Sequence, residues 1–237
     1  MKKYYSILAF YFCLMGFGLF YCKEFLNTAY DSSHFSETFL PFMTLLALLV
    51  LFFGIKNKKH VILSTTNQPS YIFFILAFLP ILGLSILSFA KNFSLTSHFL
   101  ILLVDVTLIG IAEEGMFRGL LLGSLEKKFS PVKAIILSSI FFSLLHLLNI
   151  LGGVTFSDVL NQMLSTFIMG LFLGCIYIDT KNIIFPIIFH SLWDYLILSN
   201  SIADFPFALI LIFSISVLEI VISIILLLKF SKLRSAS

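Results

Sequence analysis

Residues 206–229 read PFALILIFSISVLEIVISIILLLK, an apolar run in which Glu219 is the one charged side chain before Lys229. A helix needs about 20 predominantly apolar residues to cross the hydrocarbon core of a bilayer. The rest of the chain has the same character, since 59% of its 237 residues are hydrophobic and 11% are charged. An ordinary soluble domain carries roughly 25% charged residues. The composition therefore excludes a water-soluble fold and predicts an all-α integral membrane protein.

Seven similar segments precede this one, so the sequence predicts about eight transmembrane helices in a single polytopic membrane domain, 1–237. The expected spans are 4–22, 38–55, 70–90, 99–124, 131–149, 159–178, 182–198 and 206–229. The first is expected to span the membrane, because it is too long and bulky for the apolar part of a signal peptide and no small-residue cleavage site follows it.

Basic residues gather in alternate connections and predict the orientation of the chain. Of fifteen Lys and Arg residues, two lie in the odd-numbered connections and Arg118 lies inside a span. The other twelve lie at the termini or beside the even-numbered connections: Lys2, Lys3, Lys56, Lys58, Lys59, Lys127, Lys128, Lys133, Lys181, Lys229, Lys232 and Arg234. The positive-inside rule therefore predicts that both termini are cytoplasmic. The net charge of +3 reflects this orientation and contact with membrane lipids, not nucleic-acid binding.

Ionisable side chains at bilayer depth are costly and usually mark a functional site. Apart from Lys133 and Lys229 at the ends of their spans, eight fall within the predicted spans: Asp105, Glu113, Glu114, Arg118, His146, His190, Asp194 and Glu219. The bland alternative is that these groups only hold helices together through interhelical hydrogen bonds.

The spacing of these residues separates two roles. Glu114 and Arg118 stand four apart on one helical face and can neutralise each other. Glu113 is rotated by about 100° from its neighbour, so it lacks that partner and is available as a general base. His190 and Asp194 also share a face, and His146 adds a polar group from another helix.

At these residues the sequence resembles the CPBP family of intramembrane proteases. That family contains type II CAAX prenyl endopeptidases and the bacteriocin-processing or self-immunity (Abi) proteins of bacteria. Its three motifs stand here as EEGMFR at 113–118, FSLLH at 142–146 and HSLWD at 190–194. The resemblance covers about 99–200, which we expect to be the catalytic core, flanked by accessory helices in 1–98 and 201–237.

The resemblance implies that Glu113 and His146 activate a water molecule, while His190 and Asp194 stabilise the oxyanion. Glu114 and Arg118 would then be structural. The prenyl endopeptidases favour asparagine at the position of Asp194, and an ionised carboxylate cannot donate a hydrogen bond.

Two cofactor hypotheses follow from this departure. Either Asp194 is protonated and no cofactor is needed, or a divalent metal such as zinc binds to Glu113, His146, His190 and Asp194, as in a metalloprotease.

The sequence thus predicts an endopeptidase in the cell membrane, by resemblance the plasma membrane of a bacterium, that cleaves a hydrophobic or lipidated peptide. The alternative is a non-catalytic immunity or regulatory protein that binds a bacteriocin-like peptide or a membrane partner. A transporter is disfavoured because no paired, Gly/Pro-broken half-helices occur at corresponding positions.

Overall fold

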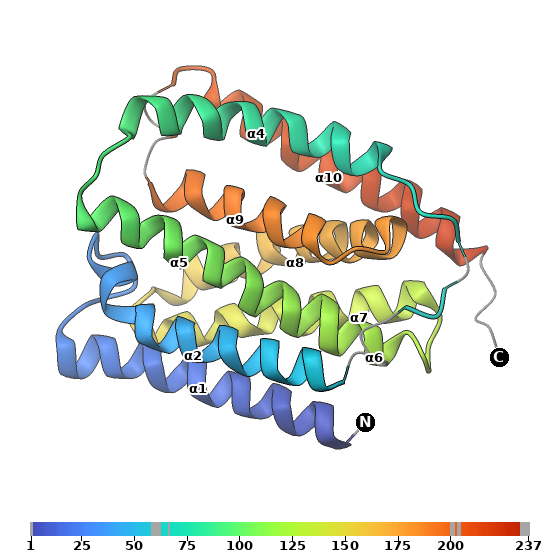
Figure 1. Cartoon of the computed structure of the whole chain (residues 1–237), viewed down its shortest axis with the longest axis horizontal. Helices are drawn as coiled ribbons and strands as arrows, with labels where there is room; N and C mark the ends of the chain where they lie inside the picture. Colours follow the sequence, from blue (N-terminus) through green and yellow to red (C-terminus); the bar gives the residue numbers. More distant parts are fainter. Residues whose placement is uncertain (1, 58–62, 66, 200–201, 203–204, 233–237) are drawn as a thin grey trace.

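The computed structural model describes residues 2–57, 63–65, 67–199, 202 and 205–232. Within these residues all regular structure is helical, as predicted from the composition (Figure 1). Lys58, Lys59 and Arg234, which were counted for the orientation, lie outside the described residues.

Eight helical segments occupy the predicted positions in the described part of the chain. Five of them are simple α-helices and three are composite or short. The elements are α1 (Lys2–Leu26), α2 (Phe35–Lys56), α4 (Ile72–Asn92), α5 (Ser97–Glu114), η1 (Gly115–Leu122), α6 (Gly123–Leu125), α7 (Pro131–Leu145), η2 (His146–Gly152), α8 (Phe156–Thr180), α9 (Ile184–Leu198) and α10 (Ala208–Ser231). α5, η1 and α6 form one rod, and η2 continues α7.

Six of these segments, among the residues described, are long and apolar enough to cross a membrane: α1, α2, α4, α7 with η2, α8 and α10. α9 is a shorter apolar helix of 15 residues. The apolar sequence of α5 is interrupted by Asp105, Glu113 and Glu114, all of which are buried. The two segments that fall short of the simple criterion for a span therefore carry most of the predicted site.

Successive segments run in opposite directions, so α1 begins at the same end of the bundle at which α10 finishes (Figure 1). α5 lies in the middle of the molecule and packs against α2 on one side and α9 on the other. α4 and α10 pack against each other beyond α9. Side chains such as Leu209 and Phe213 remain more than 70% exposed, as expected of surfaces that face lipid rather than water.

We expected a regular helix over 99–124, but the fourth span is not α-helical throughout. Residues Gly115–Leu122 form a π-helix directly after Glu114. Such segments are rare and frequently lie at functional sites. The Val50 side chain of α2 packs closely against this segment, because a Cβ added to Gly115 would lie 2.4 Å from Cγ1 of Val50.

The end of the bundle that holds the even-numbered connections is closed. The apolar residues of η1 and α6, from Met116 to Leu125, are at most 2% exposed. Beyond them, the Glu126 carboxylate accepts hydrogen bonds from the backbone N–H and the hydroxyl of Ser64, at 2.8 and 2.6 Å, and from the hydroxyl of Thr65. These contacts attach the connection after α2 to the end of α6.

Candidate active site

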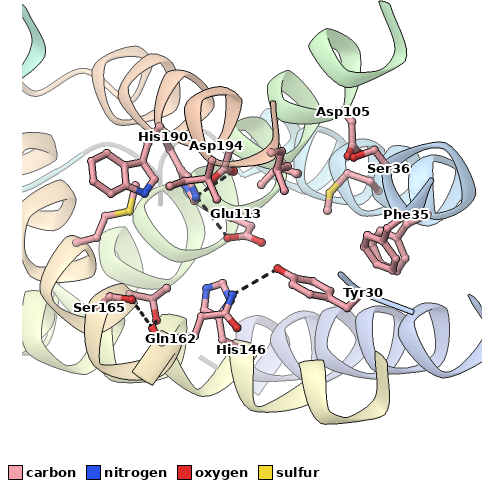
Figure 2. Close-up of a pocket in the computed structure, with 18 of the residues that line it drawn as sticks. Tyr30, Phe35, Ser36, Asp105, Glu113, His146, Gln162, Ser165, His190 and Asp194 are labelled. Carbon is pink, nitrogen blue, oxygen red and sulfur yellow. Dashed lines mark hydrogen bonds and ion pairs between the residues drawn. The ribbon is translucent and has the colours of Figure 1, made fainter. Parts of the chain in front are cut away.

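Six predicted site residues come together between α5, η1, η2 and α9, and Figure 2 shows four of them, Glu113, His146, His190 and Asp194. Glu113 and Glu114 are the last two residues of α5, Arg118 lies in η1, and His146 opens η2. His190 and Asp194 lie one turn apart on α9. Residues from three separate sequence motifs therefore meet in one place.

Glu114 joins two of these residues. Its Oε1 atom accepts a hydrogen bond from Nη1 of Arg118 at 2.7 Å and another from Nδ1 of His190 at 2.8 Å. Arg118 also donates to the carbonyl of Gly170 at 3.3 Å. Both partners of the ion pair are fully buried. Glu114 is therefore more than the counter-charge of Arg118, because it also fixes the orientation of the His190 ring.

The other nitrogen of His190 faces two more carboxylates. Nε2 lies 3.4 Å from Oδ2 of Asp194 and 3.8 Å from Oε2 of Glu113. Because Nδ1 faces a carboxylate oxygen, which can only accept while ionised, Nδ1 carries a proton. Nε2 is left to interact with the groups in the cavity.

Phe142 contacts three of the site residues. Its ring packs edge-on against His146 and His190, with centroids 5.3 and 5.8 Å apart, and the Arg118 guanidinium lies 4.3 Å from its centroid. The sequence placed Phe142 in a motif without assigning it a role. In the structure it separates three polar side chains and fixes their spacing.

A cavity of about 420 Å³ lies beside these residues. Glu113, His146, His190 and Asp194 all line it, and Figure 2 shows Glu113 and His146 facing each other across it. Among the described residues, Oε2 of Glu113 and Nε2 of His146 are buried without a hydrogen-bond partner. Unpaired buried polar atoms are costly, so both are arranged for a partner that occupies the cavity.

Residues that the sequence did not single out complete the wall opposite α9. Nε2 of Gln162 donates to the Tyr30 hydroxyl at 3.4 Å (Figure 2), and Nδ2 of Asn149 donates to Oε1 of Gln162 at 2.8 Å. Tyr30 lies in the connection between α1 and α2. No local pattern pointed to it, because its contacts come from η2 and α8.

The four residues of the metal hypothesis do not form a ready coordination site. Where the structure describes the chain, the three-residue group whose potential ligand atoms all lie within 4.8 Å of one another is His34, Glu37 and His98, none of which lines the cavity. Glu113, His146, His190 and Asp194 do not form such a group within the described residues. This arrangement does not fit a bound ion, and no step through a metal is derived from it.

Residues 94–196 match the family model of the type II CAAX prenyl endopeptidases, Rce1-like. The chain carries an Rce1-like domain over these residues, which supports membership of the CPBP family. This confirms the resemblance seen in the three motifs, and the family is one of membrane-embedded proteases. The Rce1-like domain contains all six residues described above. Met15, Tyr30 and Glu219 line the cavity from outside that domain. No curated protein matches the chain.

Proposed function

We propose that the protein is an intramembrane endopeptidase that hydrolyses a peptide bond in a hydrophobic or lipidated peptide. The observation that carries this proposal is that two polar atoms without a hydrogen-bond partner, Oε2 of Glu113 and Nε2 of His146, face one cavity from two helices. A water molecule between them would be oriented by both and deprotonated by Glu113.

The reaction follows from these positions. Glu113 takes a proton as the water oxygen attacks the peptide carbonyl, and the carbonyl oxygen becomes an oxyanion. His190 stabilises that oxyanion through Nε2–H when both ring nitrogens are protonated, a form supported by Glu114 at Nδ1. The C–N bond then breaks, and Glu113 returns its proton to the departing amine.

Asp194 has a different part in this scheme from the one the sequence implied. Its Oδ2 atom lies 3.4 Å from Nε2 of His190, so it is placed to orient the histidine. The proposed oxyanion donor is therefore His190, and Asp194 acts as its positioning residue.

The walls of the cavity favour an apolar substrate. Met15, Phe35, Phe39, Met43 and Ile109 line it together with the polar residues. A largely apolar cavity with a few converging polar groups is typical of a small-ligand or substrate site, and about 420 Å³ lies within the usual range of roughly 300–1,000 Å³.

The direct test measures turnover of a hydrophobic reporter peptide by the purified protein. We expect Glu113→Gln and His146→Ala each to lose at least about 100-fold in kcat, and the double variant to be little worse because the two act as a unit. Asp158→Asn removes an exposed carboxylate in the first turn of α8 that does not line the cavity and should retain full activity. Retained turnover in Glu113→Gln would exclude this mechanism and favour the non-catalytic binding protein.

A second measurement separates the two cofactor hypotheses. We expect the wild type and Asp194→Asn to stay active in the presence of a strong chelator, because asparagine can still hydrogen-bond to His190. A metal enzyme would lose activity with the chelator and regain it with zinc. For Asp194→Asn, the metal hypothesis predicts a loss of about 10-fold or more that excess zinc partly restores.

A further inference from the structure

The cavity extends from the catalytic residues toward one end of the bundle only. Its deepest acidic residue, Glu113, lies about 24 Å along the helix from the first residue of α5, at 1.5 Å per residue. Its outermost lining residues include Ser36 in the first turn of α2 and Leu198 in the last turn of α9. Both of these turns adjoin odd-numbered connections.

The opposite direction is blocked. Below Glu113, the apolar side chains of η1 and α6 are at most 2% exposed, and the Arg118–Glu114 pair is fully buried among them. We call these side chains of η1 and α6, with the Arg118–Glu114 pair, the plug. Glu126 and its partners Ser64 and Thr65 lie beyond it. Of the residues that the structure describes, none that lines the cavity comes from η1 or from the connections at this end.

The charges tell which end faces the cytoplasm. The basic residues described at the closed end are Lys2, Lys3, Lys56, Lys127, Lys128, Lys133, Lys181, Lys229 and Lys232. Those described at the open end are Lys23 and Lys91. Cytoplasmic connections carry the excess of Lys and Arg, so the plug faces the cytoplasm and the cavity opens away from it.

We propose that this protease admits its substrate from the extracytoplasmic side of the membrane. The substrate class is then an exported peptide, or the outer part of a membrane-anchored one. A cytoplasmic protein that carries a lipid at its C-terminus is excluded. The inference rests on the proposed function, but its first test requires no catalysis.

The test labels introduced thiols with a membrane-impermeant maleimide in intact cells. Ser165 lines the cavity and is exposed, whereas Ser231 is exposed at the opposite end of the bundle. Both substitutions are made in a Cys13→Ser background, since Cys13 is the exposed native thiol among the described residues. We expect Ser165→Cys to react in intact cells and Ser231→Cys only after permeabilisation. The proposal is wrong if Ser165→Cys reacts only after permeabilisation or if Ser231→Cys reacts without it.

Sealed vesicles then separate this inference from the protease assignment. A reporter peptide added outside should be cleaved by right-side-out vesicles at least 10-fold faster than by inside-out vesicles. Faster cleavage by inside-out vesicles overturns the direction of entry and leaves the protease intact. Cleavage by neither kind, nor by protein in detergent, overturns both.

A second, independent observation concerns the open end of the bundle. Glu37, in the first turn of α2, lies 3.0 Å from Nδ1 of His34 and 3.2 Å from Nδ1 of His98, which belongs to the first turn of α5. The potential ligand atoms of all three lie within 4.8 Å of one another. Two imidazoles and a carboxylate form a ligand set that suits zinc.

The carboxylate of Glu37 lies between the two rings, with Oε2 next to Nδ1 of His34 and Oε1 next to Nδ1 of His98. One ligand atom from each side chain lies within 4.8 Å of the others, and tetrahedral zinc ligands lie roughly 3.3 Å apart at metal–ligand bonds of about 2.0–2.2 Å. His34 and His98 are exposed and Glu37 is 31% exposed, which leaves a fourth position for water. Ser36, which lines the cavity, lies between His34 and Glu37 in the sequence.

We infer that His34, Glu37 and His98 form a divalent-metal site, with zinc as the best-matched ion, that ties α2 to α5 beside the cavity entrance. The test is thermal unfolding of purified protein with and without zinc chloride. Zinc should raise Tm by about 5–10 °C when its free concentration exceeds Kd by roughly 100-fold. His34→Gln/His98→Gln should abolish this rise, and His146→Ala should retain it. An equal rise in the His34→Gln/His98→Gln variant, or no rise in the wild type, overturns the site.

Discussion

The buried pair of Arg118 and Glu114 offers the sharpest test of how the site is held together. Arg118→Met would leave the Glu114 carboxylate, which is 0% exposed, without its cation. It would also remove the donor to the Gly170 carbonyl. Breaking a buried pair by removing one partner costs roughly 3–5 kcal/mol. At about 2–4 °C per kcal/mol for a chain of this size, Tm should fall by about 6–20 °C.

The assay is thermal unfolding in detergent, with near-ultraviolet circular dichroism as the signal. Lys23→Met is the matched control, because it breaks the pair of Lys23 with Glu24, whose side chains are 41% and 48% exposed. Such exposed pairs contribute about 1 kcal/mol or less. Glu114→Gln/Arg118→Met should recover part of the loss, since it strands no charge. If Arg118→Met lowered Tm no more than Lys23→Met does, the ion pair would not stabilise the fold as argued.

Three further predictions concern the surroundings of the site. Gly115→Ala should cost about 1–3 kcal/mol of unfolding free energy through its contact with Val50, and Val50→Ala should restore most of it in chemical denaturation. Phe142→Leu should lower kcat at least about 10-fold with a smaller change in KM, because the ring spaces both histidines; unchanged kinetics would remove it from the positioning set. Burial raises the pKa of Glu126, but hydrogen bonds from Ser64 and Thr65 outweigh it and hold that pKa below the ordinary 4.5. This carboxylate therefore stabilises the fold above about pH 5 and ceases to do so as pH falls through its folded pKa, and Glu126→Gln should flatten the acid limb of a Tm–pH profile.

The positions of the helices could be predicted because apolar runs and polar breaks fix them almost alone. The expected span 70–90, for example, became α4 at Ile72–Asn92. The first expected span, 4–22, became the longer α1 at Lys2–Leu26, since a helix continues past the last apolar residue where nothing stops it. The π-helix after Glu114 was missed, because apolar periodicity over so few residues does not distinguish it from an α-helix.

The membership of the site could also be anticipated, since costly polar groups on several helices were expected to meet. The contacts between these groups could not be predicted from the sequence. The hydrogen bond between Glu114 and His190 joins residues 76 positions apart and depends on how α5 packs against α9. The two carboxylates of the first motif were separated correctly by helical geometry, but spacing along one helix gave no sign that Glu114 also holds a histidine from another.

The sequence position of Arg118 has a consequence for how the protein is made. Arg118 and its acidic partner lie four residues apart on a single rod, so they can neutralise each other before any later helix has been synthesised. A lone charge at the centre of a helix costs about 2.5–3.5 kcal/mol on insertion, and this rod carries the acids of α5 as well. Its entry into the bilayer therefore need not wait for α9, which follows it in the chain. A chain truncated after Thr180 should still hold this rod in the membrane, and protease protection of the truncated chain would show whether it does.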